Sequence, residues 1–309
     1  MGPIHSKEQH GGKIMKRIFL TALILFASVP LWAKLKVVTT YPYIKGLVTE
    51  IASSRASVQV LSSGKRDPHF ITPRPSLIAK VRRADLVVIN GAELEIGWLP
   101  PIIRDARNRK VRPGQKGFLD LSRQVKILDK PESVSRSQGD IHPSGNPHFS
   151  LDPANMLPLA KSIARRLSAL DPSGRSHYNR NLAAFTSRWR QNLLRWKKRM
   201  GAMKGKKVIQ YHKQFDYFYR RYGINAVMEI EPLPGIPPTS GHIVRVIRRV
   251  KQGDIALIIT DVYHSKKPAK LVAAKTGVKC IIMPHDIGSF RSIDSLENLF
   301  DDITGRFPQ

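Results

Sequence analysis

The chain has 309 residues, with 52 Lys and Arg against 23 Asp and Glu, so its formal net charge is +29. Hydrophobic residues make up 41% of the sequence, which supports one or two packed cores and excludes a disordered chain. The single cysteine, Cys280, excludes an intrachain disulfide framework and a CxxC metal or redox motif, so a metal site here would use histidine and carboxylate ligands.

The first predicted element is a leader. The apolar run of residues 18–33 is too short to span a membrane and follows Lys16 and Arg17, a pattern typical of a signal peptide. We expect translation to start at Met15 and cleavage to follow Ala33, so that residues 1–33 are leader and signal peptide. A lipid anchor needs a cysteine at the cleavage point, and the sequence therefore predicts a periplasmic protein without a lipobox cysteine.

Beyond the leader, short β-branched runs alternate with helical patterns. In the first half, strands are predicted at 35–39, 57–61, 85–90 and 117–121, and helices at 44–53, 75–82 and 94–108. In the second half, strands are predicted at 207–211, 225–228, 255–260 and 279–283, and helices at 213–222, 239–251 and 267–276. This alternation predicts an α/β fold of two lobes, each a four-stranded, mostly parallel sheet covered by helices.

One long amphipathic helix is predicted between the lobes. Asp171 and Pro172 form a start signal, apolar residues recur every three or four positions as far as Met203, and Gly205 follows as a stop. Such a helix would run about 48 Å at 1.5 Å per residue and could join both lobes. The expected domains are an N-terminal lobe at 34–171, a linking helix at 172–204 and a C-terminal lobe at 205–309.

Histidines mark the predicted site. Four of them lie just past a predicted strand or in the loop that follows one, two in each lobe: His69, His148, His212 and His285. Ligands of open parallel sheets bind outside the carboxyl ends of the strands, so these imidazoles would meet in the cleft between the lobes. Four imidazoles suit a tetrahedral Zn²⁺ site, although each histidine taken singly is equally well explained as a hydrogen-bonded loop residue. Asp67 or Asp152 is expected to accept the second ring N–H of a ligand.

Several motifs, in order along the chain, resemble one known family. They are DPHF at 67–70, LEIGWL at 94–99, GNPH at 145–148, YH at 211–212 and EPLPGIPP at 231–238. Over nearly all of the chain after the leader, the sequence resembles the periplasmic metal-binding proteins of zinc and manganese ABC importers, the TroA-like or ZnuA-like family of cluster A-I solute-binding proteins. The resemblance implies one divalent metal ion held in the cleft between the lobes and delivered to an ABC permease in the inner membrane.

The resemblance also implies the ligands. His69, His148 and His212 each stand in a family motif, and histidine at the third position is similar to the zinc-type members, whereas manganese-type members tend to have glutamate there. Imidazole suits Zn²⁺, so Zn²⁺ is the expected cargo, with Mn²⁺ or Fe²⁺ as alternatives. Counting back from the glycine at 288 places His285 at the family's fourth ligand position. Its neighbour Asp286 would neutralise half of the ion's charge, so both are candidates, and water is the third possibility.

Other histidines are expected to lie outside the site. The loop at 135–146 is rich in Ser, Gly and Pro, so the metal-scavenging loop of many zinc-type relatives is reduced or absent. His142 in this loop is expected to be solvated, with an auxiliary ligand as the alternative. His177, His242 and His264 are expected on the surface.

Other classes of function have weaker support. The sequence has no HExxH motif, no GxSxG elbow and no glycine-rich phosphate loop, so we expect no enzyme, and a zinc-dependent hydrolase is a weak alternative. A basic nucleic-acid-binding or surface-adhesion protein is weaker still, because the cations are dispersed over several elements without a DNA- or RNA-binding motif. We therefore expect a monomer without a nucleic-acid partner, and the strong positive charge has no explanation at this stage.

Overall fold

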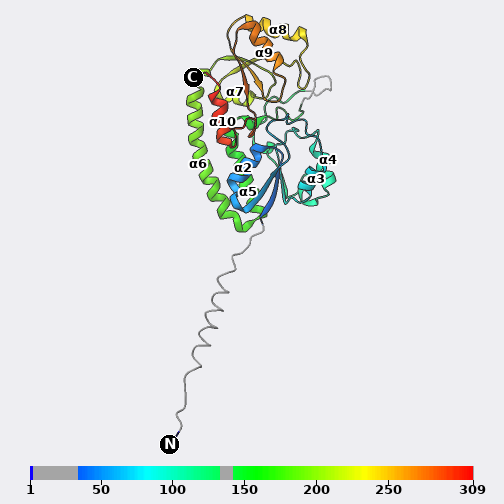
Figure 1. The fold of residues 1–309 in the computed structure, drawn as a ribbon, viewed down its shortest axis with the longest axis vertical. Coiled ribbons are helices and arrows are strands. Elements are labelled where there is room, and N and C mark those ends of the chain that lie inside the picture. The colour runs from blue at the N-terminus through cyan, green and yellow to red at the C-terminus, as the bar shows by residue number, and fades with distance from the viewer. Residues whose placement is uncertain (3–33, 133–141, 309) are drawn as a thin grey trace. The chain divides into compact units, whose positions relative to one another are not determined.

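The computed structural model describes residues 1–2, 34–132 and 142–308 (Figure 1). Leu35–Gln309 is one compact unit, and everything below concerns that unit. The predicted leader and its cleavage site lie outside the described residues. Residues 135–141, part of the loop in which a metal-scavenging segment is expected to be reduced or absent, also lie outside them. No helix in the described part of the chain is long and apolar enough to cross a membrane.

The first half of the unit forms a parallel sheet, as predicted. Its strands are β1 (Leu35–Thr39), β2 (Ala56–Val60), β3 (Leu86–Ile89) and β4 (Phe118–Asp120), in the order β2-β1-β3-β4. Helices α2 (Pro42–Ala52), α3 (Pro75–Arg82) and α4 (Leu99–Ala106) lie between them in the chain. Leu86, Val87 and Val88 of the central strand β3 are fully buried, as expected for a parallel sheet with helices on its faces.

The second half repeats this topology. Its strands are β5 (Lys207–Gln210), β6 (Asn225–Glu229), β7 (Ile255–Asp261) and β8 (Cys280–Met283), all parallel and in the order β6-β5-β7-β8. The accompanying helices are α7 (Asp216–Tyr222), α8 (Ser240–Lys251) and α9 (Lys267–Thr276). In both sheets the strand order reverses beside the first strand, and the loops leaving the strands there form the crevice in which α/β proteins bind ligands.

The predicted long helix is present. Its α-helical part, α6, spans Arg175–Arg199, and 3₁₀ turns at Pro172–Gly174 and Met200–Met203 extend it at both ends. It runs along one side of the unit (Figure 1). The indole ring of Trp189 packs against Trp196 and Phe300, with ring centroids 5.1 and 5.8 Å away, so the apolar stripe read from the sequence is a core face.

Two helices were not predicted from the sequence. They are α5 (Met156–Leu170) and α10 (Leu296–Gly305). Although α10 follows β8 in the chain, it packs on α6 and on α2 of the first half. One continuous core cluster accordingly contains Val37 of β1, Val208 of β5, Trp189 and Phe300. The two sheets are thus tied to a shared helical backing, which limits how far they can separate.

The predicted helix at 94–108 is wrong over its first turn, because α4 begins only at Leu99. The preceding segment is a loop in which Gly91, Ala92 and Glu93 have φ values of 84, 50 and 65°. The Glu95 carboxylate accepts backbone N–H groups of Asn90 and Gly91 at 2.7 and 3.1 Å. Because the Glu95 side chain takes these backbone N–H groups, the segment forms a turn and not a helix. The helix begins at Leu99, followed by prolines at 100 and 101, which favour a first helical turn.

Candidate metal centre

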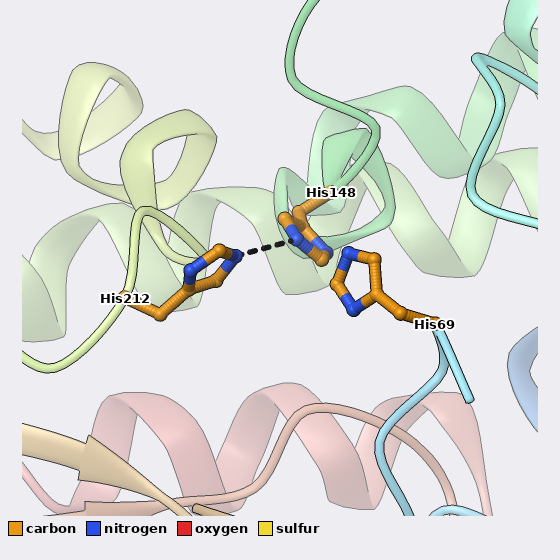
Figure 2. Close-up of side chains that lie close together, drawn as sticks. All are labelled: His69, His148 and His212. Carbon is orange, nitrogen blue, oxygen red and sulfur yellow. Dashed lines mark hydrogen bonds between the residues drawn. The ribbon is translucent and has the colours of Figure 1, made fainter. Parts of the chain in front are cut away.

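Three of the predicted ligands come together. His69, His148 and His212 each offer a ring nitrogen within 4.8 Å of the others, and the Nε2 atoms of His148 and His212 are 3.2 Å apart. Figure 2 shows the three rings converging from separate loops. His69 lies in the loop after β2, His148 directly before the 3₁₀ turn Phe149–Leu151, and His212 two residues after β5. Residues of both halves therefore build the cluster.

The loop that carries His69 is held from two sides. Asp67 Oδ1 accepts the His69 backbone N–H at 2.9 Å and lies 2.7 Å from its Nδ1. The carbonyl oxygen of Pro68 accepts hydrogen bonds from the Tyr41 hydroxyl at 2.9 Å and the Trp98 indole N–H at 3.2 Å. Asp67 thus has the predicted supporting role, since a proton on Nδ1 leaves the Nε2 lone pair free to face the cluster.

His148 is buried and its loop joins the two halves. Its backbone N–H donates to Asn146 Oδ1 at 3.0 Å, while Asn146 Nδ2 donates to the carbonyl of Lys213 at 2.7 Å. Asn90 Nδ2 donates to the carbonyl of Pro147 at 3.0 Å. The position of His148 is therefore fixed by bonds to both the β3 side and the β5 side of the cleft.

The carboxylate that supports His212 was not identified from the sequence. His212 Nδ1 contacts Glu231 Oε1, and the Glu231 side chain is only 4% exposed. Asp152, the other acid proposed for this role, instead pairs with Arg221. In the sequence, Glu231 was marked only by its place in the EPLPGIPP motif. It is 19 residues from His212 along the chain, and the pairing of β5 with β6 brings the two side chains together.

The expected surface positions of the three further histidines are wrong. His177 is half-buried, with its Nε2 3.1 Å from the carbonyl of Ala52. His264 is half-buried, stacks on Tyr211 with ring centroids 4.4 Å apart, and places its Nδ1 2.6 Å from Asp261. Its Nε2 lies 3.8 Å from Glu231, so this carboxylate sits between His212 and His264. His242 lies on the buried face of α8, with its Nε2 3.0 Å from the carbonyl of Glu229.

The expectation that His142 is solvated is also wrong. Its Nε2 is 3.2 Å from the Nε2 of His69, and the two rings stack with centroids 5.2 Å apart. Burial together with the neighbouring His69 lowers the pKa of His142 to about 3, so its ring is neutral at physiological pH. His142 also lines a cavity of about 400 Å³ with His148 and His212, which gives the cluster an opening.

His285 and Asp286 lie close by, but among the described residues the three-histidine cluster does not include them. They line a small cavity together with His148 and Tyr43. Burial lowers the pKa of His285 to about 4 and raises that of the Asp286 carboxyl well above its ordinary value. Asp286 Oδ1 accepts the backbone N–H of Ile287 at 2.7 Å.

The electrostatics of the cluster suit a cation. Burial and the neighbouring His212 lower the pKa of His148 well below its ordinary value, so His148 is a neutral donor. Burial would also lower the pKa of His212, but the contact with Glu231 outweighs it and raises the value. The Nε2 atoms of His148 and His212 are 3.2 Å apart, and two unprotonated lone pairs at this distance would repel each other unless a cation lies between them. Either a proton or a divalent metal ion would relieve that repulsion.

Comparison with known proteins identifies the family. Residues 37–300 match the family described as "ZnuA: Zinc-uptake complex component A periplasmic". The metal ABC transporter substrate-binding lipoprotein SloC of Streptococcus mutans is 24% identical over 85% of this chain and 88% of its own. The manganese ABC transporter substrate-binding lipoprotein PsaA of Streptococcus pneumoniae is 25% identical over 84% of this chain and 85% of its own. These relatives are named lipoproteins, whereas Cys280 of this chain lies in β8.

Solved structures share the fold. A crystal structure of ZnuA superimposes with a TM-score of 0.72 at 22% identity and covers 89% of this chain and 99% of its own. A Mn-bound periplasmic metal-binding protein from Candidatus Liberibacter asiaticus has a TM-score of 0.72 at 19% identity and covers 89% and 98%. The chain therefore belongs to the ZnuA family of substrate-binding proteins of metal ABC transporters.

Proposed function

We propose that this protein captures one Zn²⁺ ion in the periplasm with His69, His148 and His212 and delivers it to an ABC permease in the inner membrane. The observation that carries the proposal is the convergence of three imidazoles from three separate loops within 4.8 Å. Asp67 and Glu231 each occupy the Nδ1 side of one ring, which directs the Nε2 lone pairs inward as a metal ligand requires.

The donor atoms favour zinc over manganese. Three imidazole nitrogens suit Zn²⁺, whereas Mn²⁺ prefers carboxylate oxygens, and the carboxylates of Asp67 and Glu231 already support histidines. Manganese is the second candidate, since the relative PsaA is named for it. Fe²⁺ also accepts imidazole ligands and is a further candidate.

The fourth coordination position has three candidate side chains. The register of the family motif favours His285, charge balance favours Asp286, and His142 joins them because its Nε2 is 3.2 Å from that of His69. Two nitrogens bound to one zinc ion at about 2.0 to 2.1 Å in a tetrahedron lie roughly 3.4 Å apart, which is close to this separation. Water is the remaining ligand if none of the three binds.

We propose transport and not hydrolysis, because the chain belongs to a family of substrate-binding proteins. The protein acts in this role as a monomer and without nucleic acid. Its partners are the metal ion and the permease.

Calorimetric titration of untagged protein tests the proposal. Zn²⁺ binds one to one and more tightly than Mn²⁺, and His148→Ala or His212→Ala lowers zinc affinity by more than the roughly 10- to 100-fold that loss of a supporting residue costs. His242→Ala is the matched control, because His242 is a buried histidine of α8 whose Nε2 contacts a backbone carbonyl. Unchanged affinity in both ligand variants contradicts the site, and tighter binding of Mn²⁺ contradicts the choice of metal.

The same titration assigns the fourth position. His142→Ala, His285→Ala and Asp286→Asn are compared one at a time, and the variant that loses affinity identifies the ligand. If all three retain the affinity of the unaltered protein, the fourth ligand is water.

A further inference from the structure

The long helix α6 carries an unusual set of charges. Over its 25 residues it has eight Arg and Lys side chains and no Asp or Glu. Three of these cations bind the rest of the fold: Arg188 pairs with Glu50 and Glu297, and Arg195 and Arg199 pair with Asp301. The remaining cations are not explained by the packing of the helix.

Four of the remaining cations lie on the side of α6 that faces away from the core. We define the outer stripe of α6 as the exposed Arg180, Arg190, Leu194, Lys197 and Lys198. At 3.6 residues per turn these positions fall on one face, with Leu194 near its middle and the cations on both flanks. Within the described residues, none of these four cations forms an ion pair with a carboxylate.

Leu194 is the second distinctive feature of this face. Its side chain is 71% exposed, the largest exposure among the large apolar residues that the structure describes between 34 and 308. The core face of the same helix is formed by other residues, among them Phe185, Trp189 and Trp196. The fold therefore does not need the outer stripe.

We infer that the outer stripe docks the protein on an anionic lipid surface. The stripe lies on a helix about 37 Å long at 1.5 Å per residue. It carries cations along its length, no acidic residue, and one apolar side chain, Leu194, near the middle of the exposed face. This arrangement suits electrostatic attraction to a membrane with acidic headgroups, while the main apolar face of the helix stays in the protein core. The inference rests on the proposed function only in placing the protein beside the membrane that holds the permease.

Docking through the outer stripe leaves the metal centre free. His69, His148 and His212 lie in loops, and α6 contributes none of the clustered nitrogens. The protein can thus exchange metal while α6 rests on the lipid. Such docking also gives a role to part of the +29 net charge, which the metal centre does not explain and which opposes the approach of a cation.

Co-sedimentation with vesicles tests the inference. The purified protein is mixed with vesicles that contain phosphatidylglycerol and with vesicles of phosphatidylcholine alone. We expect binding only to the phosphatidylglycerol vesicles, weakening as salt is added. The variant Arg180→Gln, Arg190→Gln, Lys197→Gln, Lys198→Gln should lose tenfold or more of its apparent affinity, since each cation near an acidic surface adds to the binding.

A second variant with the same loss of charge separates the stripe from the net charge. It neutralises four exposed cations of α8 and α9: Arg248→Gln, Lys251→Gln, Lys270→Gln and Lys275→Gln. We expect it to bind phosphatidylglycerol vesicles nearly as well as the unaltered protein. The inference is overturned if both variants lose the same amount of vesicle affinity. It is also overturned if the unaltered protein does not bind phosphatidylglycerol vesicles at physiological salt, even if it binds another polyanion.

Metal titration of the same proteins keeps this test separate from the proposed function. Both four-residue variants should bind Zn²⁺ like the unaltered protein, because they alter no residue of the cluster. Loss of vesicle binding with zinc binding intact supports the inference. Vesicle binding by a protein that binds no metal supports the docking surface and contradicts the proposed function.

Discussion

At the scale of single residues, the three-histidine cluster depends on carboxylates that support its rings. The Glu231 side chain is 4% exposed and is placed between the rings of His212 and His264. Burying a carboxylate is costly unless it is bonded, and the contact with His212 Nδ1 compensates for that cost. The same contact fixes which nitrogen of His212 faces the cluster.

Glu231→Gln should therefore weaken metal binding without removing a ligand. We expect zinc affinity to fall about 10- to 100-fold, because the amide no longer orients or polarises the His212 ring as the carboxylate does. Glu229→Gln is the control, since Glu229 lines the same cavity but bonds to Gln210. A loss of equal size in both variants, measured by calorimetry, would mean that the general negative charge and not the orientation of His212 matters.

The cap before the long helix is also set by single side chains. Asp171 bonds to Arg55 at 2.8 Å, to the Tyr178 hydroxyl at 2.6 Å and to the backbone N–H of Gly174 at 3.2 Å. The hydrogen bond from Arg55 lowers the pKa of Asp171 below its ordinary value of 3.8. The charged form is thus favoured in the folded state.

This lowered pKa predicts a pH dependence of stability. The contribution of Asp171 is fully present above its ordinary pKa of 3.8 and is lost as the pH falls below that value, because the unfolded chain then takes up the proton first. At neutral pH, Asp171→Asn should lower the free energy of unfolding by about 1–3 kcal/mol. The difference between the two proteins in urea unfolding should shrink in acid, and a difference that stays constant down to low pH would refute the pairing.

At the scale of elements, α6 has two faces with separate roles. Trp189 packs between Trp196, Phe185 and Phe300, and its indole N–H donates to the carbonyl of Pro153 at 2.7 Å. The helix therefore joins α10 to the segment before α5. The opposite face is exposed and carries the outer stripe.

Truncating a side chain should change the free energy of unfolding strongly on the core face of α6 and only slightly on its exposed face. Trp189→Ala should lower the free energy of unfolding by about 3–5 kcal/mol, because it leaves a cavity in the shared core. Leu194→Ala, on the exposed face of the same helix, should change it by less than about 0.5 kcal/mol. Urea unfolding of both variants measures the contrast, and a small effect of Trp189→Ala would show that α6 is not a structural support of both sheets.

At the scale of the whole molecule, the three-histidine cluster connects the two halves. Asn146 bonds across the cleft to the carbonyl of Lys213, and α10 packs back on α2 and α6. Because one core cluster runs through both halves, capture of an ion should draw loops together without a large rotation of either sheet.

Metal binding should accordingly stabilise the whole fold. A free Zn²⁺ concentration of 100 times Kd adds about 2.7 kcal/mol to the free energy of unfolding, since the ion binds the folded chain and not the separated loops. Differential scanning calorimetry should show a higher Tm with zinc, reversed by a chelator. The His69→Ala, His148→Ala double variant should show no such shift, and a zinc-dependent rise in its Tm would place the ion elsewhere.

The sequence alone determined the strands, most of the helices between them, the long helix and the three clustered histidines. These are local matters: β-branched runs, 3.6-residue periodicity and short motifs act over a few neighbouring residues. The first turn of the predicted helix at 94–108 was wrong because a buried carboxylate, Glu95, takes the backbone N–H groups of Asn90 and Gly91.

Only the tertiary structure decided which groups surround each ring. Glu231 supports His212 because β6 pairs with β5, and His142 contacts His69 across 73 residues of chain. His264 and His242 are polar side chains that the sequence favours on the surface, but their hydrogen bonds to Asp261 and to a backbone carbonyl compensate for burial. Contacts between residues distant in sequence arise from packing of the sheets, and no local pattern encodes them.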